Sequence, residues 1–374
     1  MALNKKLIAL QKSFSRFAGK EIAPRRDLGM LEDFPVELWR KMAAAQLLGV
    51  GIPEPYGGRG GNYLSVLSAG ESLVESGHNL GIALAWIIHT VAARFFLLGF
   101  GNEQQRRLYL PALASGTITA SIAISEPDVG AHPAHLQTSA SLSNSTYTLH
   151  GEKTWLTNGP IAGLFIVLAI TGASSGRKEF SAFLVLKDTP GLHLTKKIPL
   201  DCLRPSTHCG IRLEGCKVPA GSMLGQSGSA YERMAKPFRD LEDALLMGPV
   251  LGAMTAQLEM VITALKRNGA LPSNDIKTEL GGLESHRQAM RIIAYEVARI
   301  LDAGASENVL LPPLLSLRPL AQGFQSRLER LVAGREDEEL RGLTKDLLRI
   351  IGIAKNVALI KQKKIGEKLL SGKD

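Results

Sequence analysis

Residues 121–130 read Ser121-Ile122-Ala123-Ile124-Ser125-Glu126-Pro127-Asp128-Val129-Gly130, and residues 151–159 read Gly151-Glu152-Lys153-Thr154-Trp155-Leu156-Thr157-Asn158-Gly159. The apolar run of the first segment predicts a buried strand that ends in a Pro/Gly loop with exposed backbone N–H groups. The second segment predicts a strand that carries Trp155 two residues before the hydroxyl of Thr157. Backbone donors and a hydroxyl can bind the polar edge of a flat ring while an indole covers part of its face. On these residues alone a simpler interpretation stays open, in which the loop is only a turn and Trp155 belongs to the core.

The order of patterns along the chain places both segments in a central β region. Residues 1–116 show apolar side chains at helical spacing, and helical patterns return over residues 229–374. Between them, residues 117–228 hold apolar runs separated by turns, which are typical of strands. The sequence therefore predicts an α+β fold with an N-terminal helical domain, a central antiparallel β-barrel or sandwich domain and a C-terminal helical bundle. Because strands and helices do not alternate, a doubly wound nucleotide-binding fold is disfavoured.

Composition is that of an ordinary globular protein, with 374 residues of which 45% are hydrophobic and 21% charged. The long apolar stretch from Gly81 to Phe100 contains His89 and Arg94. A central arginine costs about 2.5 kcal/mol or more in a bilayer, so we expect a buried helix and no membrane span. Residues 1–17 lack an apolar block followed by a cleavage site, which favours a first structural helix and a cytoplasmic location over an export signal.

The net charge of +9 has two interpretations, a solvated basic surface or attraction of an anionic ligand or acidic partner. Nucleic acid is not expected as a partner, because aromatic residues are only 5% and no binding motif is present. Cys202, Cys209 and Cys216 recur every seven residues next to His208. Zinc sites favour closely spaced cysteine pairs, so these three are interpreted as incidental thiols and no metal is predicted.

The two central motifs resemble the signature of the acyl-CoA dehydrogenase family, which reads Thr-Glu-Pro-x-Ala-Gly-Ser-Asp and Trp-Ile-Thr-Asn-Gly. The corresponding segments here are residues 125–132, SEPDVGAH, and residues 155–159, WLTNG. The resemblance extends from about Phe17 to about Met254. It implies a flavoprotein that holds the isoalloxazine of FAD with Ile122, Ile124, Ser125, Gly130, Ala131, Trp155 and Thr157.

The chemistry that the resemblance implies needs a general base. Dehydrogenation of a thioester at Cα–Cβ requires a carboxylate that removes the α-proton while flavin N5 accepts the β-hydride. In much of the family a glutamate near the C-terminus does this, but the matching residue here is Ile351, which cannot act as a base. A minority, including isovaleryl and long-chain enzymes, carries the glutamate within Asp-Leu-Glu-Arg on the first helix after the β domain. This chain has Asp240-Leu241-Glu242-Asp243 at that place.

Glu242 is therefore the predicted catalytic base. By the same resemblance, Asp240 is predicted to contact the pantetheine of CoA and Ala131 to lie beside the substrate. An alternative is that Glu242 is only a surface or helix-start carboxylate favoured by the helix dipole.

Several residues depart from the family pattern. Asp243 replaces the arginine after the base, and Ala131-His132 replace Ser-Asp of the first motif. The family's Arg-x-x-Phe-Gly segment, which binds FAD phosphates from a neighbouring subunit, is reduced to Lys266-Arg267-Asn268-Gly269. A further FAD motif is not recognisable over residues 325–334. These departures predict altered phosphate binding at the subunit interface.

The leading hypothesis is a flavin-dependent acyl-CoA dehydrogenase that passes electrons to an electron-transfer flavoprotein and forms a homodimer or homotetramer, as the resemblance implies. One alternative keeps the flavin but changes the reaction, to a monooxygenase or to a dehydrogenase for a carrier-protein thioester. Another is a degenerate family member that binds an acyl thioester or a partner subunit without turnover.

Overall fold

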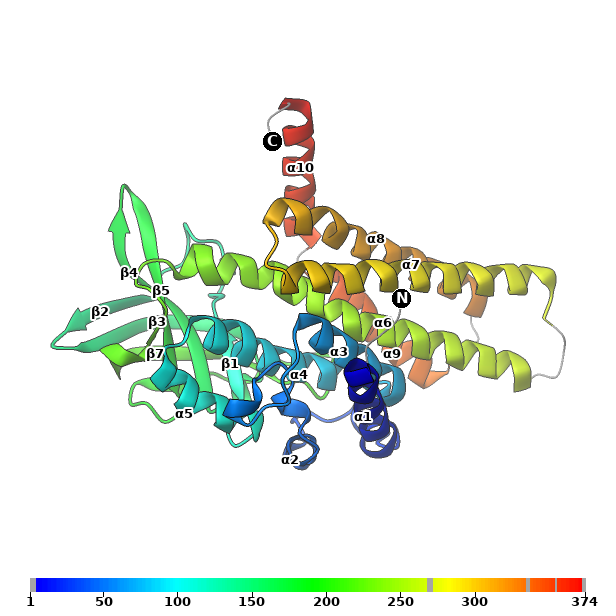
Figure 1. Cartoon of the computed structure of the whole chain (residues 1–374), viewed down its shortest axis with the longest axis horizontal. Helices are drawn as coiled ribbons and strands as arrows, with labels where there is room; N and C mark the ends of the chain where they lie inside the picture. Colours follow the sequence, from blue (N-terminus) through cyan, green and yellow to red (C-terminus); the bar gives the residue numbers. More distant parts are fainter. Residues whose placement is uncertain (1–4, 268–271, 334–336, 354, 372–374) are drawn as a thin grey trace. The chain divides into compact units, whose positions relative to one another are not determined.

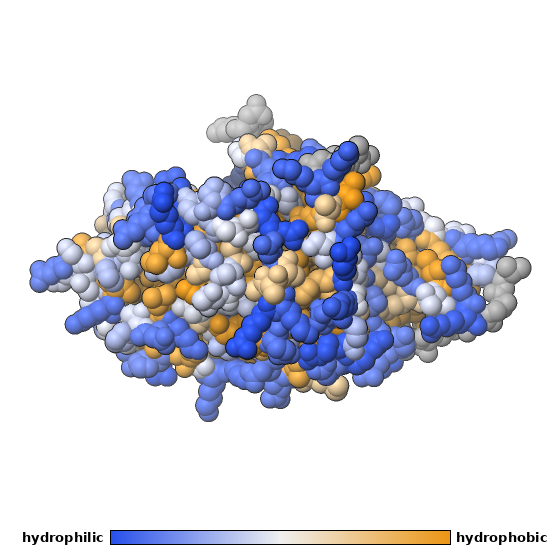
Figure 2. Space-filling view, turned by 60° about the horizontal axis from the view of Figure 1, so that its bottom comes forward, coloured by the Kyte–Doolittle hydropathy of each residue, from blue (hydrophilic) through white to orange (hydrophobic). Residues whose placement is uncertain are grey.

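The computed structural model describes residues 5–267, 272–333, 337–353 and 355–371 (Figure 1). The chain divides into two compact units. Unit 1 comprises Met1–Gly29, Tyr63–Leu80 and Asp243–Asp374, and unit 2 comprises Met30–Asn62 and Gly81–Glu242. On the face shown in Figure 2, hydrophilic residues predominate and apolar residues occur in scattered groups, as in a water-exposed surface.

Unit 2 contains the β-sheet. Within the described residues it has eight strands, in the order β6-β7-β3-β2-β4-β5-β8, with β1 paired to β4. The strands are β1 (Ala120–Ala123), β2 (Ser139–Ser143), β3 (Thr146–Thr157), β4 (Leu164–Ser174), β5 (Arg177–Leu186), β6 (Leu192–Leu194), β7 (His208–Pro219) and β8 (Met223–Leu224). Buried side chains from β3, β4, β5 and β7 form its hydrophobic core, among them Leu149, Phe165, Phe183 and Ile211.

The predicted fold class is confirmed, with one difference in the sheet. The β1–β4 pairing and the single β2–β4 pair are parallel, so the sheet is mixed and not purely antiparallel. The other pairings are antiparallel, as expected. The three-domain boundaries expected from the sequence stay a prediction.

Helices of unit 2 accompany the sheet. They are α2 (Val36–Ala44), most of α4 (Leu80–Val91), α5 (Glu103–Ala114), the start of α6 (Lys236–Arg267), and the short segments η1 (Leu47–Gly49), η2 (Glu54–Tyr56), η3 (Ala92–Leu98), η4 (Gly159–Ile161), η5 (Ala220–Ser222) and η6 (Tyr231–Ala235). The start of α5 is a capping box, because Asn102 accepts from the Gln105 backbone N–H and the Gln105 side chain accepts in return.

His89, fully buried in α4, joins three elements of unit 2. Its Nδ1 accepts from the backbone N–H of Ala120 at 3.2 Å, so the ring hydrogen lies on Nε2, which donates to the Leu113 carbonyl at 3.1 Å. Burial lowers the pKa of His89 to about 4, and the ring is neutral at pH 7. A single tautomer therefore connects α4 to the end of α5 and the start of β1.

Two helical stretches among the described residues, Leu80–Leu98 and Tyr231–Arg267, are long and apolar enough to cross a bilayer. In the apolar 18-residue window of each stretch, 89% and 83% of the residues respectively are buried inside the protein. This burial is typical of core helices, as expected for the stretch around Arg94.

Unit 1 is helical. It contains α1 (Lys5–Glu21), α3 (Tyr63–Gly77), the part of α6 from Asp243 onward, α7 (Asn274–Asp302), α8 (Glu307–Val332), α9 (Glu338–Gly352) and α10 (Lys355–Ser371). Helices α3 and α6 approach to backbone contact. A Cβ on Gly248 would lie 2.2 Å from the carbonyl oxygen of Leu67, and one on Gly252 would lie 2.3 Å from that of Glu71.

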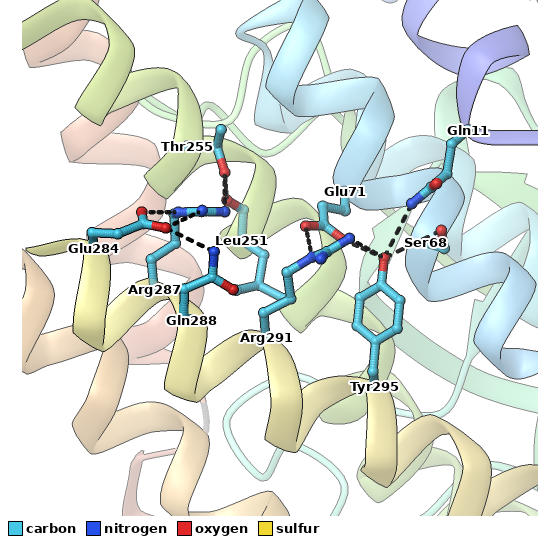
Figure 3. A network of polar contacts seen from close by, with 10 residues as sticks. All are labelled: Gln11, Ser68, Glu71, Leu251, Thr255, Glu284, Arg287, Gln288, Arg291 and Tyr295. Carbon is cyan, nitrogen blue, oxygen red and sulfur yellow. Dashed lines mark hydrogen bonds and ion pairs between the residues drawn. The ribbon is translucent and has the colours of Figure 1, made fainter. Parts of the chain in front are cut away.

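A buried polar network holds α3 against α7 (Figure 3). Glu71 on α3 is 3% exposed and accepts from the Arg291 Nε at 2.8 Å and from the Tyr295 hydroxyl. The Arg291 guanidinium also lies over the Tyr295 ring, 4.8 Å from its centroid. Burial and the neighbouring Glu71 raise the pKa of Tyr295 to about 12, so the phenol keeps its proton and donates it to the carboxylate.

We predict that Gly252→Ala destabilises the protein by about 1–3 kcal/mol, because the new methyl group forces α3 and α6 apart. Gly281→Ala is the matched control, since a Cβ there meets no atom within 4 Å on the exposed side of α7. It should stabilise by about 0.5–1 kcal/mol through helix propensity. Thermal unfolding followed by circular dichroism measures both, and equal midpoints for the two variants would contradict the close contact.

Candidate functional site

The loop after β1 forms a closed turn. Glu126 and Gly130 exchange backbone hydrogen bonds of 2.9 and 3.0 Å, and Asp128 and Gly130 have left-handed φ angles of 62° and 59°. A Cβ on Gly130 would meet no atom within 4 Å, so the glycine serves its backbone conformation and leaves open space beside the turn. The Ser125 carbonyl accepts from the backbone N–H of Thr154 at 2.9 Å, which ties the start of the loop to β3.

A buried ion pair fixes this loop to β3. Lys153 is fully buried, and its Nζ donates to Oε1 of Glu126 at 2.9 Å and to the carbonyl of Ile124 at 3.0 Å. Glu126 also accepts from the backbone N–H groups of Gln137 and Thr138 at 2.7 and 2.9 Å. Burial alone would raise the pKa of Glu126, but Lys153 and the hydrogen bonds hold it below its usual value. Burial lowers the pKa of Lys153 to about 8 against the attraction of Glu126, so both groups are charged at neutral pH.

The side chain of Trp155 is exposed on the protein surface near the end of β3. Its φ is 61°, a left-handed value that is rare outside glycine, and it lies where the β3–β7 register shifts between Lys153 and Leu156. Its side chain is 53% exposed, so the interpretation of Trp155 as a core residue is wrong. An exposed indole is free to cover the face of a flat ligand, and a left-handed backbone conformation of this kind occurs most often at functional sites.

Thr157, the last residue of β3, is half-buried and lies between β1 and β7. Its carbonyl accepts from the Ser121 hydroxyl at 2.7 Å, and its Oγ1 lies 2.9 Å from Nε2 of His208, the first residue of β7. Burial lowers the pKa of His208 to about 4. In the sequence His208 is marked only by its neighbouring cysteines, and its contact with Thr157 was not predicted, because no local motif joins residues on β3 and β7.

The remaining predicted flavin residues line the same segment. Ile122 is half-buried in β1, Ile124 is buried, and Ser125 and Ala131 are half-buried in the loop. The carbonyl of Ala131 lies 3.5 Å from the Tyr231 hydroxyl, which belongs to the π-helical turn η6 directly before α6. The loop therefore contacts the segment that leads to the predicted substrate residues.

Asp240 and Glu242 lie inside a continuous helical stretch. Asp240 is 5% exposed and Glu242 is half-buried. The helical stretch begins at Tyr231 with η6 and continues into α6, so Glu242 lies well beyond the first turn. Because the favourable effect of the helix dipole falls off within one turn, the explanation of Glu242 as a helix-start carboxylate has no support. Its role as a base stays a prediction.

The residues after the β-sheet that depart from the family pattern lie in different surroundings. Ile351 is 2% exposed in α9, where it packs as a core residue. Arg318 pairs with Asp243, the residue after the predicted base, at 3.4 Å. Of the altered FAD segments, Asn268, Gly269 and Gly334 lie outside the described residues.

Comparison with known proteins shows which family models and which relatives this chain matches. The model for the acyl-CoA dehydrogenase N-terminal domain matches residues 4–117, and that for the middle domain matches residues 121–216. An acyl-CoA dehydrogenase of Bacillus subtilis (strain 168) is 30% identical over 310 residues, which cover 81% of this chain and 81% of that protein. The mitochondrial isovaleryl-CoA dehydrogenase of Solanum tuberosum is 31% identical over 302 residues, covering 79% and 73%.

Solved structures have the same fold. Butyryl-CoA dehydrogenase from Megasphaera elsdenii superposes with a TM-score of 0.86 at 24% identity, covering 96% of this chain and 97% of that one. PigA, solved with FAD and proline, gives a TM-score of 0.87 at 23% identity, covering 99% and 98%. The prolyl acyl carrier protein oxidase AnaB gives 0.82 at 26% identity, covering 94% of each chain.

For the loop itself, we predict that Lys153→Met destabilises the protein by about 3–5 kcal/mol, because it leaves the Glu126 carboxylate buried without its cation. The double variant Lys153→Met/Glu126→Gln should lose less, since the remaining amide can still accept from the loop backbone. Thermal or urea unfolding of the three proteins measures this. If Lys153→Met were as stable as the wild-type protein, the ion pair would not be what holds the loop.

The middle-domain match includes both segments from which the resemblance was inferred, the 125–132 loop and the end of β3. They confirm the predicted enzyme class, FAD-dependent oxidoreductases, and FAD as the cofactor of this class. With both domain models matched and a relative at 30% identity over most of its length, the chain belongs to the acyl-CoA dehydrogenase family.

Proposed function

We propose that this protein catalyses α,β-dehydrogenation of an acyl-CoA thioester, with FAD as cofactor and Glu242 as the base. The observation that carries the proposal is the end of β3, where an exposed, left-handed Trp155 stands two residues before the half-buried hydroxyl of Thr157. A core tryptophan would need neither the exposure nor the strained backbone.

The residues present fit a flavin. Trp155 offers an aromatic face, Thr157 a hydroxyl, and the turn at Gly130 leaves open space beside the backbone. These groups would hold the isoalloxazine ring, which when bound supplies the acceptor for the β-hydride. The buried Glu126–Lys153 pair keeps the loop in place, so little reorganisation is needed when the ring binds.

The protein's own chemical step is proton removal. Glu242 is a half-buried carboxylate within two residues of the buried Asp240. In this proposal Glu242 takes the α-proton of the thioester, and Asp240 contacts the pantetheine of CoA. A carboxylate shielded from water suits this task better than one that is fully solvated, because a weakly acidic proton needs a desolvated base.

We predict that Glu242→Gln lowers the rate at which an acyl-CoA bleaches the flavin absorption by about 10²–10⁴-fold, while the flavin stays bound. Anaerobic mixing with a panel of acyl-CoAs, followed by absorption spectroscopy, measures the rate. Glu232→Gln is the control, since Glu232 is an exposed carboxylate on the same helical stretch. Unchanged bleaching by Glu242→Gln would assign the base to another residue, and a colourless wild-type protein would favour a binding role without turnover.

A second candidate keeps the flavin and the base but takes a thioester on a carrier protein. It is favoured by the similarity to AnaB, a prolyl acyl carrier protein oxidase. Bleaching of the flavin by a carrier-protein thioester but by no acyl-CoA would select this reaction.

In either case, we propose an electron-transfer flavoprotein as the electron acceptor, a partner expected from the family.

We further propose that the protein is a homodimer or homotetramer in which the C-terminal helices take part. Helix α10 exposes several large apolar side chains, with Leu359 and Ile360 more than half exposed and Leu369 and Leu370 at 79% and 91%. Neighbouring leucines at this exposure are unusual on a surface that stays in contact with water.

Light scattering after size exclusion should therefore give a mass of two or four times 40.2 kDa. Leu369→Lys/Leu370→Lys should lower that mass or make it depend on concentration, because two buried charges destabilise an apolar contact. Leu142→Lys, which changes an exposed leucine of β2, is the matched control. A wild-type monomer would contradict the assembly, and an unchanged mass of the double variant would remove α10 from the interface.

A further inference from the structure

We propose that His208 is a positioning residue, which holds the Thr157 hydroxyl so that its hydrogen is directed to an acceptor at the edge of the flavin. The inference rests on the proposed flavin site and adds a residue that the family motifs do not include. It follows from the hydrogen-bonding capacity of three groups, the Thr157 hydroxyl and the two ring nitrogens of His208.

The two side chains are neighbours across the sheet. Thr157 and His208 are directly paired where β3 and β7 run antiparallel, and Oγ1 lies 2.9 Å from Nε2. The ring is almost completely enclosed, with His208 at 8% exposure. Water therefore cannot easily replace this contact, and the ring and the hydroxyl must satisfy each other.

The tautomer of His208 decides which group donates. The Nδ1 atom is buried and has no hydrogen-bond partner within the described part of the chain. The ring is neutral, so it carries one hydrogen. On Nδ1 that hydrogen would be a buried donor without an acceptor, which is unfavourable because the N–H loses its bond to water and gains none in the protein. Buried N–H groups without partners are rarer in proteins than unsatisfied acceptors, so the hydrogen belongs on Nε2.

With its hydrogen on Nε2, His208 donates and the Thr157 oxygen accepts. A threonine hydroxyl has one hydrogen and two acceptor positions, so its own hydrogen is left for a second partner. The opposite tautomer would consume that hydrogen in the bond to His208. The imidazole thus leaves the Thr157 hydroxyl free to donate its hydrogen. A ring nitrogen or carbonyl of an oxidised flavin is an acceptor and needs such a donor.

The segment before His208 is held firmly in place. A Cβ on Gly81, at the start of α4, would lie 2.2 Å from the Leu203 carbonyl oxygen, so the loop before β7 rests directly on helix backbone. The Thr207 carbonyl accepts from Asn158 N–H at 3.0 Å, and the His208 carbonyl accepts from Ile198 N–H at 2.8 Å. A ring with fixed backbone on both sides has little freedom to turn away from Thr157.

The experiment compares His208→Phe, His208→Gln and Thr157→Val, and combines the first with the last. Phenylalanine removes the donor, whereas the glutamine amide can place an N–H near the position of Nε2. Two measurements are made on each protein, the reduction potential of the bound flavin and the affinity of the apoprotein for FAD. Thermal unfolding confirms that each variant is folded.

We expect His208→Phe to shift the flavin potential in the same direction as Thr157→Val and to weaken FAD binding up to tenfold, a change typical of one lost hydrogen bond. His208→Gln should restore most of both properties. In the double variant the potential should equal that of Thr157→Val alone, because His208 acts through the hydroxyl.

Two outcomes would overturn the proposal. One is an unchanged potential in His208→Phe while Thr157→Val shifts it, and the other is a double variant whose shift is the sum of the two single shifts. Both leave the flavin site itself intact, and so they are distinct from failure of the proposed function, in which Thr157→Val also leaves flavin affinity and potential unchanged. That last result would remove this inference as well.

Discussion

The site depends on one buried ion pair, Lys153 with Glu126. A loop that follows a strand has no sheet partner of its own, yet this one must keep a fixed shape beside β3. The pair supplies that shape, because Glu126 binds the far end of the loop at Gln137 and Thr138 while Lys153 binds its start at Ile124. Two charges buried together are favourable only when further hydrogen bonds satisfy them, and here both have such bonds. A loss of either partner would leave an uncompensated charge at the centre of the loop.

The same lysine is the last residue of β3 before the pairing with β7 shifts its register. From His150 to Lys153 the strand follows β7 residue by residue, and after Lys153 the register shifts and Trp155 takes a left-handed conformation. Strain of this kind costs about 1–3 kcal/mol and persists only where the surroundings enforce it. The strand regains its pairing at Leu156 and Thr157, which meet Cys209 and His208. The irregularity thus turns the indole outward and leaves the hydroxyl beside an imidazole, so one defect in the sheet produces both groups of the site.

Much of this could be predicted from the sequence, and the parts that could not have a common cause. Strand, loop and strand were readable from residues 121–130 and 151–159, because apolar runs and turn residues act locally. Parallel pairing of β1 with β4 was missed, since side-chain alternation does not reveal the direction of a partner strand. The exposure of Trp155 depends on a register shift, and the contact of Thr157 with His208 joins residues 51 positions apart. Both are properties of the assembled sheet. The backbone contact at Gly252 is likewise a property of the assembled helices α3 and α6, and no local pattern reveals it.

The unit to which each predicted site residue belongs bears on whether residue 242 or residue 351 is the position of the base. Every predicted flavin residue, together with Asp240 and Glu242, falls within unit 2, whereas Ile351 belongs to unit 1 and packs in its core. A base at residue 242 follows the sheet along one continuous helical stretch that starts at Tyr231, whose hydroxyl lies near the Ala131 carbonyl of the loop. Its position is therefore set by the unit that carries the predicted flavin residues. The hydrocarbon side chain at residue 351 contributes to the core of unit 1, and the predicted flavin residues and the predicted base all belong to the other unit.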